Sequence, residues 1–355
     1  MIIFLLPCFS GGGAERVAIN LLTGLHNRGH SVGIMVFNKS GVLLSIIPSD
    51  IPIYDLSRSA LKSSIIPLIK KIRQLEPKVV FSTFGYINVA LLATSWLLPK
   101  KTKIWIREAN MPSMSLPNNA YPKLMKSLYR MFYRKADLLI CTSYRMKDEF
   151  VSVFYVSESI IEVIPNPVNV AMIRESLTPV ERYDQGGVCY VASGRLTFQK
   201  GFDRLLCWFS ELKNKKSTLV ILGDGSLKFY LTGRAKILNI QNRVKFVGFC
   251  NNPWKWYAGA DVFLLPSRWE GMSNSALEAL ACGTPVIATA DSGGIKEVKE
   301  CTPFGTVTVV ENGEQFIQHM DKIVLQKGAG CRSSLLPDDY HLNSVLQTME
   351  NLLND

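Results

Sequence analysis

Arg268-Trp-Glu-Gly-Met-Ser-Asn-Ser-Ala-Leu-Glu278 lies between two short apolar segments, at 263–266 and 285–288. The apolar segments predict buried strands, 267–272 predicts a tight loop, and 274–282 predicts a helix that starts from this loop. The loop thus leaves the carboxyl end of one strand and enters a helix. Open α/β sheets bind anions at such a point, because a helix amino terminus offers free N–H groups and positive partial charge.

Two carboxylates stand at the ends of this motif, Glu270 on the loop and Glu278 on the helix, with seven residues between them. A helix amino terminus attracts a phosphate, whereas acids beside it repel one. The two acids are therefore better suited to accept hydrogen bonds from hydroxyl groups. A phosphate bound beside hydroxyl groups describes a sugar nucleotide.

Length and composition predict two domains in a reducing compartment. The chain has 355 residues, and its 47% of hydrophobic residues are enough for two buried cores. No apolar run approaches the roughly 20 residues of a membrane span, and residues 1–9 are too short and lack the basic leader of a signal peptide, so they predict a first buried strand. Without a C-x-x-C pair, the cysteines predict reduced thiols in a cytoplasm rather than disulfides or structural zinc. They are Cys8, Cys141, Cys189, Cys207, Cys250, Cys282, Cys301 and Cys331.

The formal charge of +11 is concentrated in the first half of the chain. Residues 1–170 hold 20 Lys and Arg against 10 Asp and Glu, whereas residues 171–355 hold 20 against 19. Such an asymmetry suggests an anionic partner for one domain, either a nucleic acid or an acidic membrane face. Charge that serves solubility alone is the other interpretation.

Strands and helices alternate along the chain, which predicts α/β domains with parallel sheets covered on both faces. In the first half we expect strands at 2–7, 31–37, 79–82, 104–107 and 138–142, with helices at 14–26, 61–75 and 86–97. In the second half we expect strands at 188–193, 218–222, 244–247, 263–266 and 285–288, with helices at 202–213, 226–238, 251–258, 274–282 and 342–353. The predicted boundaries are a first domain at 1–168, a linker at 169–187, a second domain at 188–340 and a terminal helix at 341–355.

A glycine-rich loop follows the first predicted strand, in Ser10-Gly-Gly-Gly-Ala-Glu-Arg16. Three glycines between a strand and a helix let the backbone approach a ligand closely, because no Cβ stands in the way. A tight turn that binds nothing is the alternative. The loop is not the G-x-G-x-x-G of dinucleotide-binding proteins.

Two cations, Arg195 and Lys200, follow the first predicted strand of the second domain in the sequence Gly-Arg-Leu-x-x-x-Lys-Gly. Such a pair on one loop suits a diphosphate, and above all the negative charge that develops as a sugar–phosphate bond breaks. Stabilising developing charge is commonly the largest contribution to catalysis. By themselves, the two residues would more often be a pair of ordinary surface cations.

Taken together, these motifs resemble the family 4 glycosyltransferases, which share the Glu-x7-Glu signature of Glu270 and Glu278. The resemblance runs through nearly the whole chain, since several separate motifs occur in family order. It implies retaining enzymes with the GT-B fold, an α/β architecture in which two Rossmann-like, doubly wound domains face a cleft.

On the donor side, the resemblance implies that Arg195 and Lys200 bind the diphosphate. It also implies that Glu278 accepts from the ribose and that Glu270 contacts hydroxyl groups of the donor sugar. Free solvation of the two acids is the alternative, which the neighbouring apolar side chains disfavour. The resemblance further implies a UDP donor held by backbone groups at Gly13, Gly223, Gly248, Gly271, Ser273, Asn274 and Ser275.

On the acceptor side, Gly12 and Gly13 resemble a family loop that faces the donor phosphate and the acceptor. Many family members carry a histidine after the strand at 104–106, where this chain has Arg107-Glu108. Glu108 is therefore our candidate for contacting the transferring sugar or the acceptor hydroxyl. Two questions stay open: whether Glu15 pairs with Arg16 or lines the site, and which residue takes the place of the histidine. His26 and His30 are expected to be surface residues at a helix end.

The sequence contains no Asp-x-Asp, the pair with which metal-dependent glycosyltransferases bridge a diphosphate. We therefore predict metal-independent catalysis, with the UDP-sugar as substrate and no cofactor. Glu108 is the only acid expected near the reacting carbon, which leaves no nucleophile and acid pair of the glycosidase type. As in the family, retention by same-face attack is expected, with the leaving phosphate taking the acceptor proton.

A basic amphipathic segment at 121–135 is expected to form a helix with cations on one face. Basic residues beside interfacial aromatic residues suit an anionic bilayer surface, at about 1 kcal/mol per cation. An ordinary amphipathic helix packed on its sheet is the alternative. The cations are Lys123, Lys126, Arg130 and Arg134, the apolar face is Leu124, Leu128, Met131 and Phe132, and the flanking aromatic residues are Tyr129 and Tyr133.

The expected function is transfer of a hexose or N-acetylhexosamine, with N-acetylgalactosamine the best guess, from a UDP-sugar to a polyprenyl-diphosphate-linked saccharide. The step would belong to bacterial surface or N-linked glycan assembly. Gly-Gly-Ala-Glu-Arg-Val near the start and Arg-Glu-Ala-Asn-Met-Pro-Ser113 look most like bacterial N-acetylgalactosaminyltransferases that extend such lipids. We expect a cytoplasmic protein, peripheral on the inner face of the cell membrane, with no nucleic acid as partner. The alternatives are a soluble or lipopolysaccharide-core acceptor, or a non-catalytic module that binds sugar nucleotides or nucleic acid.

Overall fold

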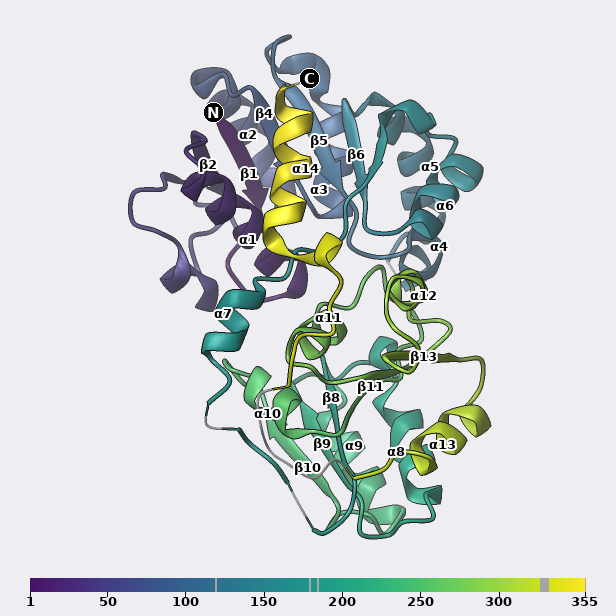
Figure 1. Ribbon diagram of the computed structural model, residues 1–355. Coiled ribbons are helices and arrows are strands. Elements are labelled where there is room, and N and C mark those ends of the chain that lie inside the picture. Colours follow the sequence, from purple (N-terminus) through teal and green to yellow (C-terminus); the bar gives the residue numbers. More distant parts are fainter. Residues whose placement is uncertain (119, 179, 184, 326–331, 355) are drawn as a thin grey trace. The chain divides into compact units, whose positions relative to one another are not determined.

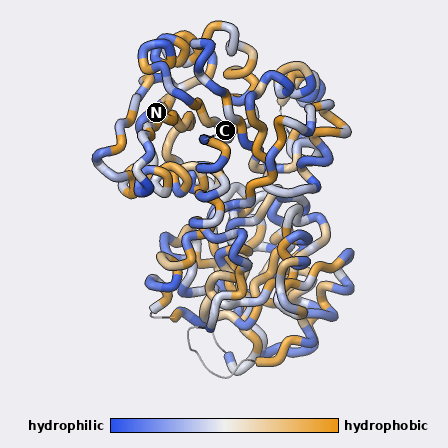
Figure 2. The backbone as a smooth tube through the Cα atoms, turned by 45° about the horizontal axis from the view of Figure 1, so that its top comes forward, coloured by the Kyte–Doolittle hydropathy of each residue, from blue (hydrophilic) through white to orange (hydrophobic). Residues whose placement is uncertain are grey.

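The chain divides into two compact units, each with its own sheet and core (Figure 1). Unit 1 comprises Met1–Pro167 and the C-terminal segment from Leu342, and unit 2 comprises Val168–His341. Hydrophobic and hydrophilic residues alternate in short stretches along the backbone of both units (Figure 2). The structure, a computed structural model, describes residues 1–118, 120–178, 180–183, 185–325 and 332–354.

Unit 1 is built on a seven-stranded sheet in the order β3-β2-β1-β4-β5-β6-β7, in which every neighbouring pair is parallel. Most of its strands are unbroken apolar runs, because a parallel sheet is covered by helices on both faces. The strands are β1 Ile2–Leu6, β2 Val32–Val36, β3 Ile53–Asp55, β4 Val79–Ser82, β5 Lys103–Arg107, β6 Leu138–Cys141 and β7 Ile161–Val163.

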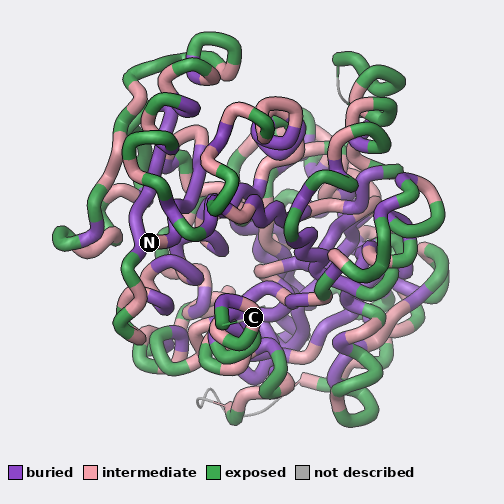
Figure 3. The backbone as a smooth tube through the Cα atoms, turned by 90° about the horizontal axis from the view of Figure 1, so that it is seen from above, coloured by how far each residue is buried: buried purple, intermediate pink, exposed green. Residues whose placement is uncertain are grey.

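Helices cover both faces of this sheet, and a separate core lies on each face. One core packs α2, α3, α5 and α6 onto the sheet, and the other packs α1 and α14. Buried residues follow the strands and the inward helix faces, and exposed residues lie on the outside (Figure 3). The α-helices are α1 Gly13–Asn27, α2 Leu61–Leu75, α3 Gly85–Ala93, α4 Pro112–Ser115, α5 Pro122–Phe132, α6 Tyr144–Phe154 and α14 Leu342–Asn354.

The C-terminal helix α14 returns to unit 1 and packs against α1 (Figure 1). Glu350 accepts a hydrogen bond from Arg28 at 2.6 Å and contacts Nε2 of His30 at 2.9 Å. Leu346 packs on Gly24, where a side chain would leave no room for it. His30, expected on the surface at a helix end, therefore helps to hold the terminal helix.

Unit 2 has a six-stranded parallel sheet in the order β10-β9-β8-β11-β12-β13. Its two cores pack α7, α10, α11 and α12 on one face and α8, α9 and α13 on the other. The strands are β8 Cys189–Ser193, β9 Thr218–Leu222, β10 Val244–Gly248, β11 Val262–Leu265, β12 Val286–Thr289 and β13 Val307–Val310. The helices are α7 Val170–Glu175, α8 Phe202–Glu211, α9 Lys228–Ile237, α10 Trp254–Gly259, α11 Asn274–Ala281, α12 Ile295–Glu300 and α13 Gly313–Asp321.

The described residues of the predicted linker, 169–187, lie within unit 2. Asn169 caps α7 by accepting from Met172 N at 3.1 Å, and Ile173 and Leu177 are buried in the core beneath α11. The polar composition of the segment hid these two apolar anchors. The structure also ends the helix predicted at 86–97 at Ala93, after which a single 3₁₀ turn follows.

Free thiols and short helices are found in the parts of the chain that the structure describes. The cysteines in these parts of the chain are free, and Cys331 lies outside the described residues. No helix among the described residues has the length and apolar character that crossing a membrane would take.

Candidate functional site

Glycine residues bring three neighbouring strands of unit 2 together at their carboxyl ends. Gly223, after β9, has φ +125°, and a Cβ there would overlap the carbonyl oxygen of Gly194 after β8. Its N–H donates to the carbonyl of Gly248 at 2.7 Å. Gly248 has φ +86° and open space where its side chain would be. Of the predicted donor-side glycines, Gly223 is thus required by packing, whereas Gly248 leaves room beside the backbone.

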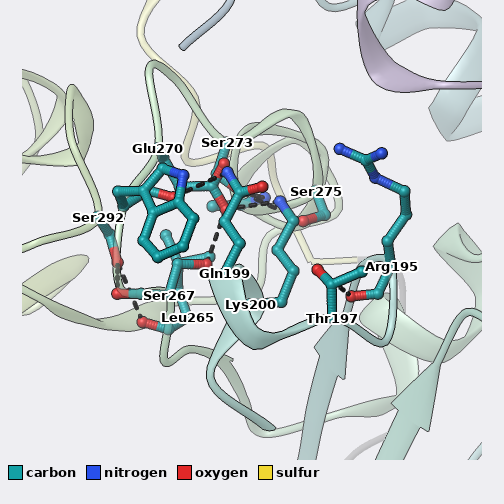
Figure 4. A network of polar contacts seen from close by, with 12 residues as sticks. Arg195, Thr197, Gln199, Lys200, Leu265, Ser267, Glu270, Ser273, Ser275 and Ser292 are labelled. Atoms are coloured by element: carbon teal, nitrogen blue, oxygen red, sulfur yellow. Dashed lines mark hydrogen bonds and ion pairs between the residues drawn. The ribbon is translucent and has the colours of Figure 1, made fainter. Parts of the chain in front are cut away.

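Lys200 and Glu270 form a close ion pair at the same edge of the sheet (Figure 4). The Lys200 Nζ lies 2.5 Å from Glu270 Oε1, and Ser267 Oγ donates to the same oxygen at 2.7 Å. Glu270 is only 4% exposed. Two residues that the sequence places seventy positions apart are therefore joined in an ion pair, in which the acid is buried and the lysine is half-buried.

The loops that carry this pair are clamped to each other. Arg268 makes a two-pronged contact with Asp203, at 2.8 and 2.7 Å, and its guanidinium lies 3.8 Å from the ring centre of Phe198. The Arg268 N–H donates to the carbonyl of Gln199 at 2.8 Å, and Gln199 Nε2 donates to the carbonyl of Trp269 at 3.0 Å. Sequence reasoning missed this clamp, because nothing local to either loop identifies its partner.

A second set of contacts, from Arg204, Thr289 and Gly294, holds the backbone of the loop that carries Glu270. Arg204 donates to the carbonyls of Pro266 and Ser267, at 2.8 and 2.6 Å, and Thr289 donates to that of Ser267 at 2.7 Å. Gly294 N donates to the carbonyl of Gly271 at 2.8 Å. The loop is thus fixed from three sides, which pre-organises the side chains it carries.

The amino terminus of α11 lies directly after this loop. Ser273 caps the helix by accepting from Ala276 N at 3.4 Å, and Ser275 Oγ donates to the carbonyl of Ser193 at 3.2 Å. Asn274 is the first residue of the helix. The predicted phosphate-facing residues Gly271, Ser273, Asn274 and Ser275 therefore lie together at the strand–helix junction.

Glu278 lies one further turn along α11 and is half-buried. Its Oε2 accepts from the indole N–H of Trp254 at 3.0 Å. Burial, and then the nearby Glu278 carboxylate, raise the pKa of Tyr257 well above its usual value. Neither acid of the Glu-x7-Glu motif is thus a freely solvated charge, which was the alternative left open by the sequence.

Arg195 stands apart from the ion pair. Its side chain is exposed, and its guanidinium lies apart from the Lys200–Glu270 pair in Figure 4. Its guanidinium makes no hydrogen bond or ion pair with any residue that the structure describes. Of the two cations predicted to bind a diphosphate, Lys200 is therefore paired with Glu270, whereas Arg195 extends into solvent.

In unit 1, Glu108 follows β5 and is 5% exposed. Its Oε1 accepts from Asn88 Nδ2 at 3.1 Å, from the Tyr129 hydroxyl at 3.3 Å and from the Tyr133 hydroxyl. Burial raises the pKa of Glu108 to about 7, although the hydrogen bonds from Tyr133, Asn88 and Tyr129 oppose this rise. A carboxyl group with that pKa is ionised or neutral in comparable amounts near neutral pH.

Arg107 directs its guanidinium to other partners than its neighbour Glu108. It is 2% exposed and donates to Thr83 Oγ1 at 3.1 Å and to Asn166 Oδ1. Burial lowers its pKa to about 10, an effect that the Glu108 charge opposes. Arg107 therefore ties the segment that follows β7, at Asn166, to the sheet, a role that no sequence signal indicated.

The glycine-rich loop after β1 encloses a buried acid. Glu15 is 6% exposed and accepts from Ser10 Oγ at 2.6 Å, and a Cβ on Gly12 would overlap its carboxylate. Among the described residues Glu15 forms no ion pair with Arg16, so that part of the open question is settled against pairing. Gly12 precedes α1 and Gly13 begins it. The space that a side chain at Gly12 would need is thus occupied by the Glu15 carboxylate.

The expected surface aromatics of the basic segment are buried instead. Tyr129 and Tyr133 are 4% and 0% exposed, and their rings stack at 4.2 Å between centres. Sequence reasoning failed here because tyrosine suits an interface and a core equally well. The exposed apolar side chains on α5 and beside it are Tyr121, Leu124 and Met131. The four predicted cations Lys123, Lys126, Arg130 and Arg134 are exposed, as expected.

A metal centre in the described ranges would need at least three ligand side chains close together. No three His, Cys, Asp or Glu side chains in those ranges gather as a metal site requires. The metal-independent reaction remains a prediction from the sequence.

Comparison with known families gives two adjoining matches. Residues 11–172 match the model described as Glycosyltransferase Family 4, and residues 174–332 match the one described as Glycosyl transferases group 1. The boundary between the two matches lies close to the boundary between the two structural units.

Curated relatives were found over most of the chain. A Campylobacter jejuni protein is 30% identical over 319 residues, which are 86% of this chain and 85% of that protein. It is named N-acetylgalactosamine-N,N'-diacetylbacillosaminyl-diphospho-undecaprenol 4-alpha-N-acetylgalactosaminyltransferase. An uncharacterized glycosyltransferase of Methanocaldococcus jannaschii is 30% identical over 245 residues, so the match spans 65% of this chain and 60% of that relative.

Solved structures share the whole fold. Anabaena HepE in complex with UDP-glucose superposes with a TM-score of 0.77 at 20% identity, covering 99% of both chains. The expected α/β fold, two doubly wound Rossmann-like domains of the GT-B type, is confirmed by this likeness and by the two parallel sheets.

Proposed function

Since this chain belongs to the family 4 glycosyltransferases, we propose that it moves a hexose or N-acetylhexosamine from a UDP-sugar to a saccharide carried on a polyprenyl diphosphate, with retention of configuration. The name of the Campylobacter relative supports N-acetylgalactosamine as the first sugar to test and a lipid diphosphate as the carrier. The UDP-glucose bound to HepE supports a uridine donor.

The observation that carries this proposal is the Lys200–Glu270 pair at the glycine-lined edge of unit 2. In the proposed reaction, the Lys200 ammonium stabilises the charge that builds up on the departing diphosphate. Glu270 accepts from hydroxyl groups of the donor sugar, and Glu278 accepts from the ribose. Arg195, whose side chain is exposed, closes on the diphosphate when the donor arrives.

The backbone amides around Ser273 and Asn274 add to this grip, because they lie at the amino terminus of α11. Together with Lys200 and Arg195 they supply positive charge that a bridging cation supplies in Asp-x-Asp enzymes. We therefore propose that transfer proceeds without a metal ion and that the leaving phosphate takes the acceptor proton.

Unit 1 supplies the acceptor side in this proposal. Glu108 contacts the transferring sugar or the acceptor hydroxyl, and the loop at Gly12 and Gly13 contacts the acceptor. The exposed lysines of α5, beside Leu124 and Met131, support docking on an anionic membrane. The protein would then work on the cytoplasmic face, where it meets both UDP-sugars and lipid-linked acceptors.

The test is a transfer assay with radiolabelled UDP-N-acetylgalactosamine, UDP-N-acetylglucosamine, UDP-glucose and UDP-galactose, each with a membrane lipid extract and with soluble oligosaccharides. We expect label to enter the lipid extract with one donor and to persist in EDTA. Label in soluble saccharides alone would contradict the lipid acceptor, and loss of transfer in EDTA would contradict the metal-independent reaction. Release of UDP without any labelled transfer product would mean that the donor is hydrolysed, and would contradict glycosyl transfer.

A further inference from the structure

Helix α5 turns two tyrosines inward to one carboxylate. Tyr129 and Tyr133 are four residues apart, so they share a face of the helical segment formed by α5 and the 3₁₀ turn Tyr133–Lys135. Both hydroxyls donate to Oε1 of Glu108, at the end of β5. Asn88 of α3 gives the same oxygen a third donor at 3.1 Å. Donors from two elements, the α5 segment and α3, therefore converge on one atom of a residue that follows β5.

The chain makes room for this arrangement at Gly85, the first residue of α3. A Cβ at that position would overlap the hydroxyl oxygen of Tyr129 and would lie 3.3 Å from Glu108 Oε1. No positive φ is recorded for Gly85, so its backbone is open to other residues. The space for the tyrosine hydroxyl is the reason for glycine here.

The tyrosine rings are held as firmly as their hydroxyls. Tyr129 and Tyr133 stack at 4.2 Å, and Phe150 of α6 stacks on Tyr133 at 5.4 Å with an interplanar angle of 10°. Phe154 packs on Tyr129 at 5.7 Å. Rings fixed on two sides cannot turn their hydroxyls elsewhere, so the two donors stay directed at the carboxylate.

All hydrogen bonds to the Glu108 side chain from the described residues end on Oε1. The other oxygen, Oε2, accepts no hydrogen bond from them. One oxygen is thus fixed by the protein, and the other is oriented by the same bonds without being used by them.

We infer that Tyr129 and Tyr133 are positioning residues that set the direction of the Glu108 carboxylate and join it to the basic helix α5. This inference rests on the proposed function, in which Glu108 contacts the transferring sugar or the acceptor hydroxyl. The inner face of α5 thereby holds the acid, while the outer face presents Lys123 and Lys126. The exposed lysines of α5 and the Glu108 carboxylate are thus connected through one helix.

The tyrosines also control the ionisation of Glu108. Each hydroxyl donates to the carboxylate and favours the charged form, against burial, which favours the neutral form. The groups that face this carboxyl are Tyr129 and Tyr133 from the α5 segment, Asn88 from α3, Arg107 from β5 and Cys141 from β6. Removing a tyrosine hydroxyl therefore raises the pKa of Glu108.

The experiment compares Tyr133→Phe and Tyr129→Phe with wild type, because phenylalanine keeps the ring stack and removes only the hydroxyl. We expect Tyr133→Phe to lower kcat by roughly tenfold near neutral pH, with little change in KM for the UDP-sugar. The acidic limb of the kcat/KM profile should move to higher pH. Tyr190→Phe is the matched control, since Tyr190 is a buried tyrosine of unit 2 whose hydroxyl donates to the carbonyl of Met320 at 2.7 Å. It should leave the limb in place.

A second readout does not depend on transfer. The Glu108 carboxyl signal can be followed by ¹³C NMR of glutamate-labelled protein and assigned by its loss in Glu108→Gln. We expect its pKa to rise in Tyr133→Phe and less in Tyr129→Phe, whose hydroxyl is farther from the acid. An unchanged pKa in both variants would overturn the inference. A raised pKa together with full transfer by Glu108→Gln would support the tyrosine contacts and refute only the proposed role of Glu108.

Discussion

The two sheets each hold a buried glutamate just past the carboxyl end of a strand, and they hold it in opposite ways. Glu270 in unit 2 is paired with the ammonium of Lys200 and with one serine hydroxyl. Glu108 in unit 1 accepts only from neutral donors, two tyrosines and an asparagine. The nearest cation in sequence, Arg107, bonds Thr83 and Asn166 instead.

The two environments suit the two glutamates to different chemical roles. The charge of Glu270 is balanced by Lys200, and in the proposed reaction the arriving diphosphate draws the Lys200 ammonium toward itself. A carboxyl group held by neutral donors can gain or lose a proton near neutral pH, because burial has raised its pKa to about 7. The first arrangement suits charge stabilisation, and the second suits contact with a hydroxyl group.

Lys200→Ala tests the charged half of the comparison and should have the largest effect. If the ammonium stabilises the leaving diphosphate, kcat should fall by roughly 100- to 1,000-fold, as for the loss of a transition-state donor. The dissociation constant of UDP should change far less. Steady-state transfer kinetics and UDP titration by calorimetry give the two values.

Folding is the control for that variant, because Lys200→Ala also leaves Glu270 buried without its cation. The unfolding midpoint should be measured beside that of Lys296→Ala, which removes a half-exposed lysine lying 3.8 Å from Glu311. Equal losses in UDP affinity and in kcat would contradict leaving-group stabilisation as the role of Lys200.

Glu108→Gln tests the neutral half through stability. Between the ordinary glutamate pKa of 4.5 and the folded value of about 7, the folded protein keeps a proton that the unfolded chain has lost. Stability from this group is therefore full below pH 4.5 and is lost as pH rises toward 7, by about 3 kcal/mol in all. Urea unfolding at pH 5 and pH 8 should show a larger drop for wild type than for Glu108→Gln. Parallel changes in the two proteins would mean that Glu108 titrates normally.

Apolar runs and helix signals predicted most strands and helices, since these follow from local pattern. Strands β3, β7 and β13, of three or four residues each, are too short for a periodic signal and were missed. The Glu-x7-Glu spacing identified Glu270 and Glu278, yet nothing local could reveal that Glu270 pairs with Lys200. Contacts between residues that lie far apart in sequence depend on the packed fold.

The basic segment illustrates the same limit in one helix. Periodicity separates the two faces of the helix but does not say which face packs on the sheet. Tyrosine occurs both in buried cores and at membrane interfaces. The sequence therefore favoured a membrane surface for Tyr129 and Tyr133, whereas their hydroxyls donate to Glu108. The lysines were predicted correctly, because charged side chains are rarely buried.

A pair of glycine variants sharpens the description of the unit 2 edge. Gly223→Ala places a methyl group against the carbonyl of Gly194, whereas Gly248→Ala meets open space, and both residues have positive φ. Backbone strain of about 1 kcal/mol applies to both, and only Gly223→Ala must also push two strand ends apart, so it should be less stable by roughly a further 1 to 3 kcal/mol. Denaturant unfolding measures the difference. Equal stabilities would show that the β8 and β9 ends can separate freely, against the tight edge described above.

The outer face of α5 gives the smallest expected effect. Lys126→Gln removes one exposed cation from a surface proposed to meet anionic lipid, and one lysine near such a surface contributes about 1 kcal/mol, or roughly a fivefold change in vesicle binding. Sedimentation with phosphatidylglycerol vesicles measures this change, with Lys62→Gln on α2 as the matched exposed lysine. Because the side chain lies outside the packed cluster, the pKa of Glu108 should stay as in wild type. A shift of that pKa in Lys126→Gln would mean that surface charge, and not the tyrosine hydroxyls alone, sets the ionisation of the acid in unit 1.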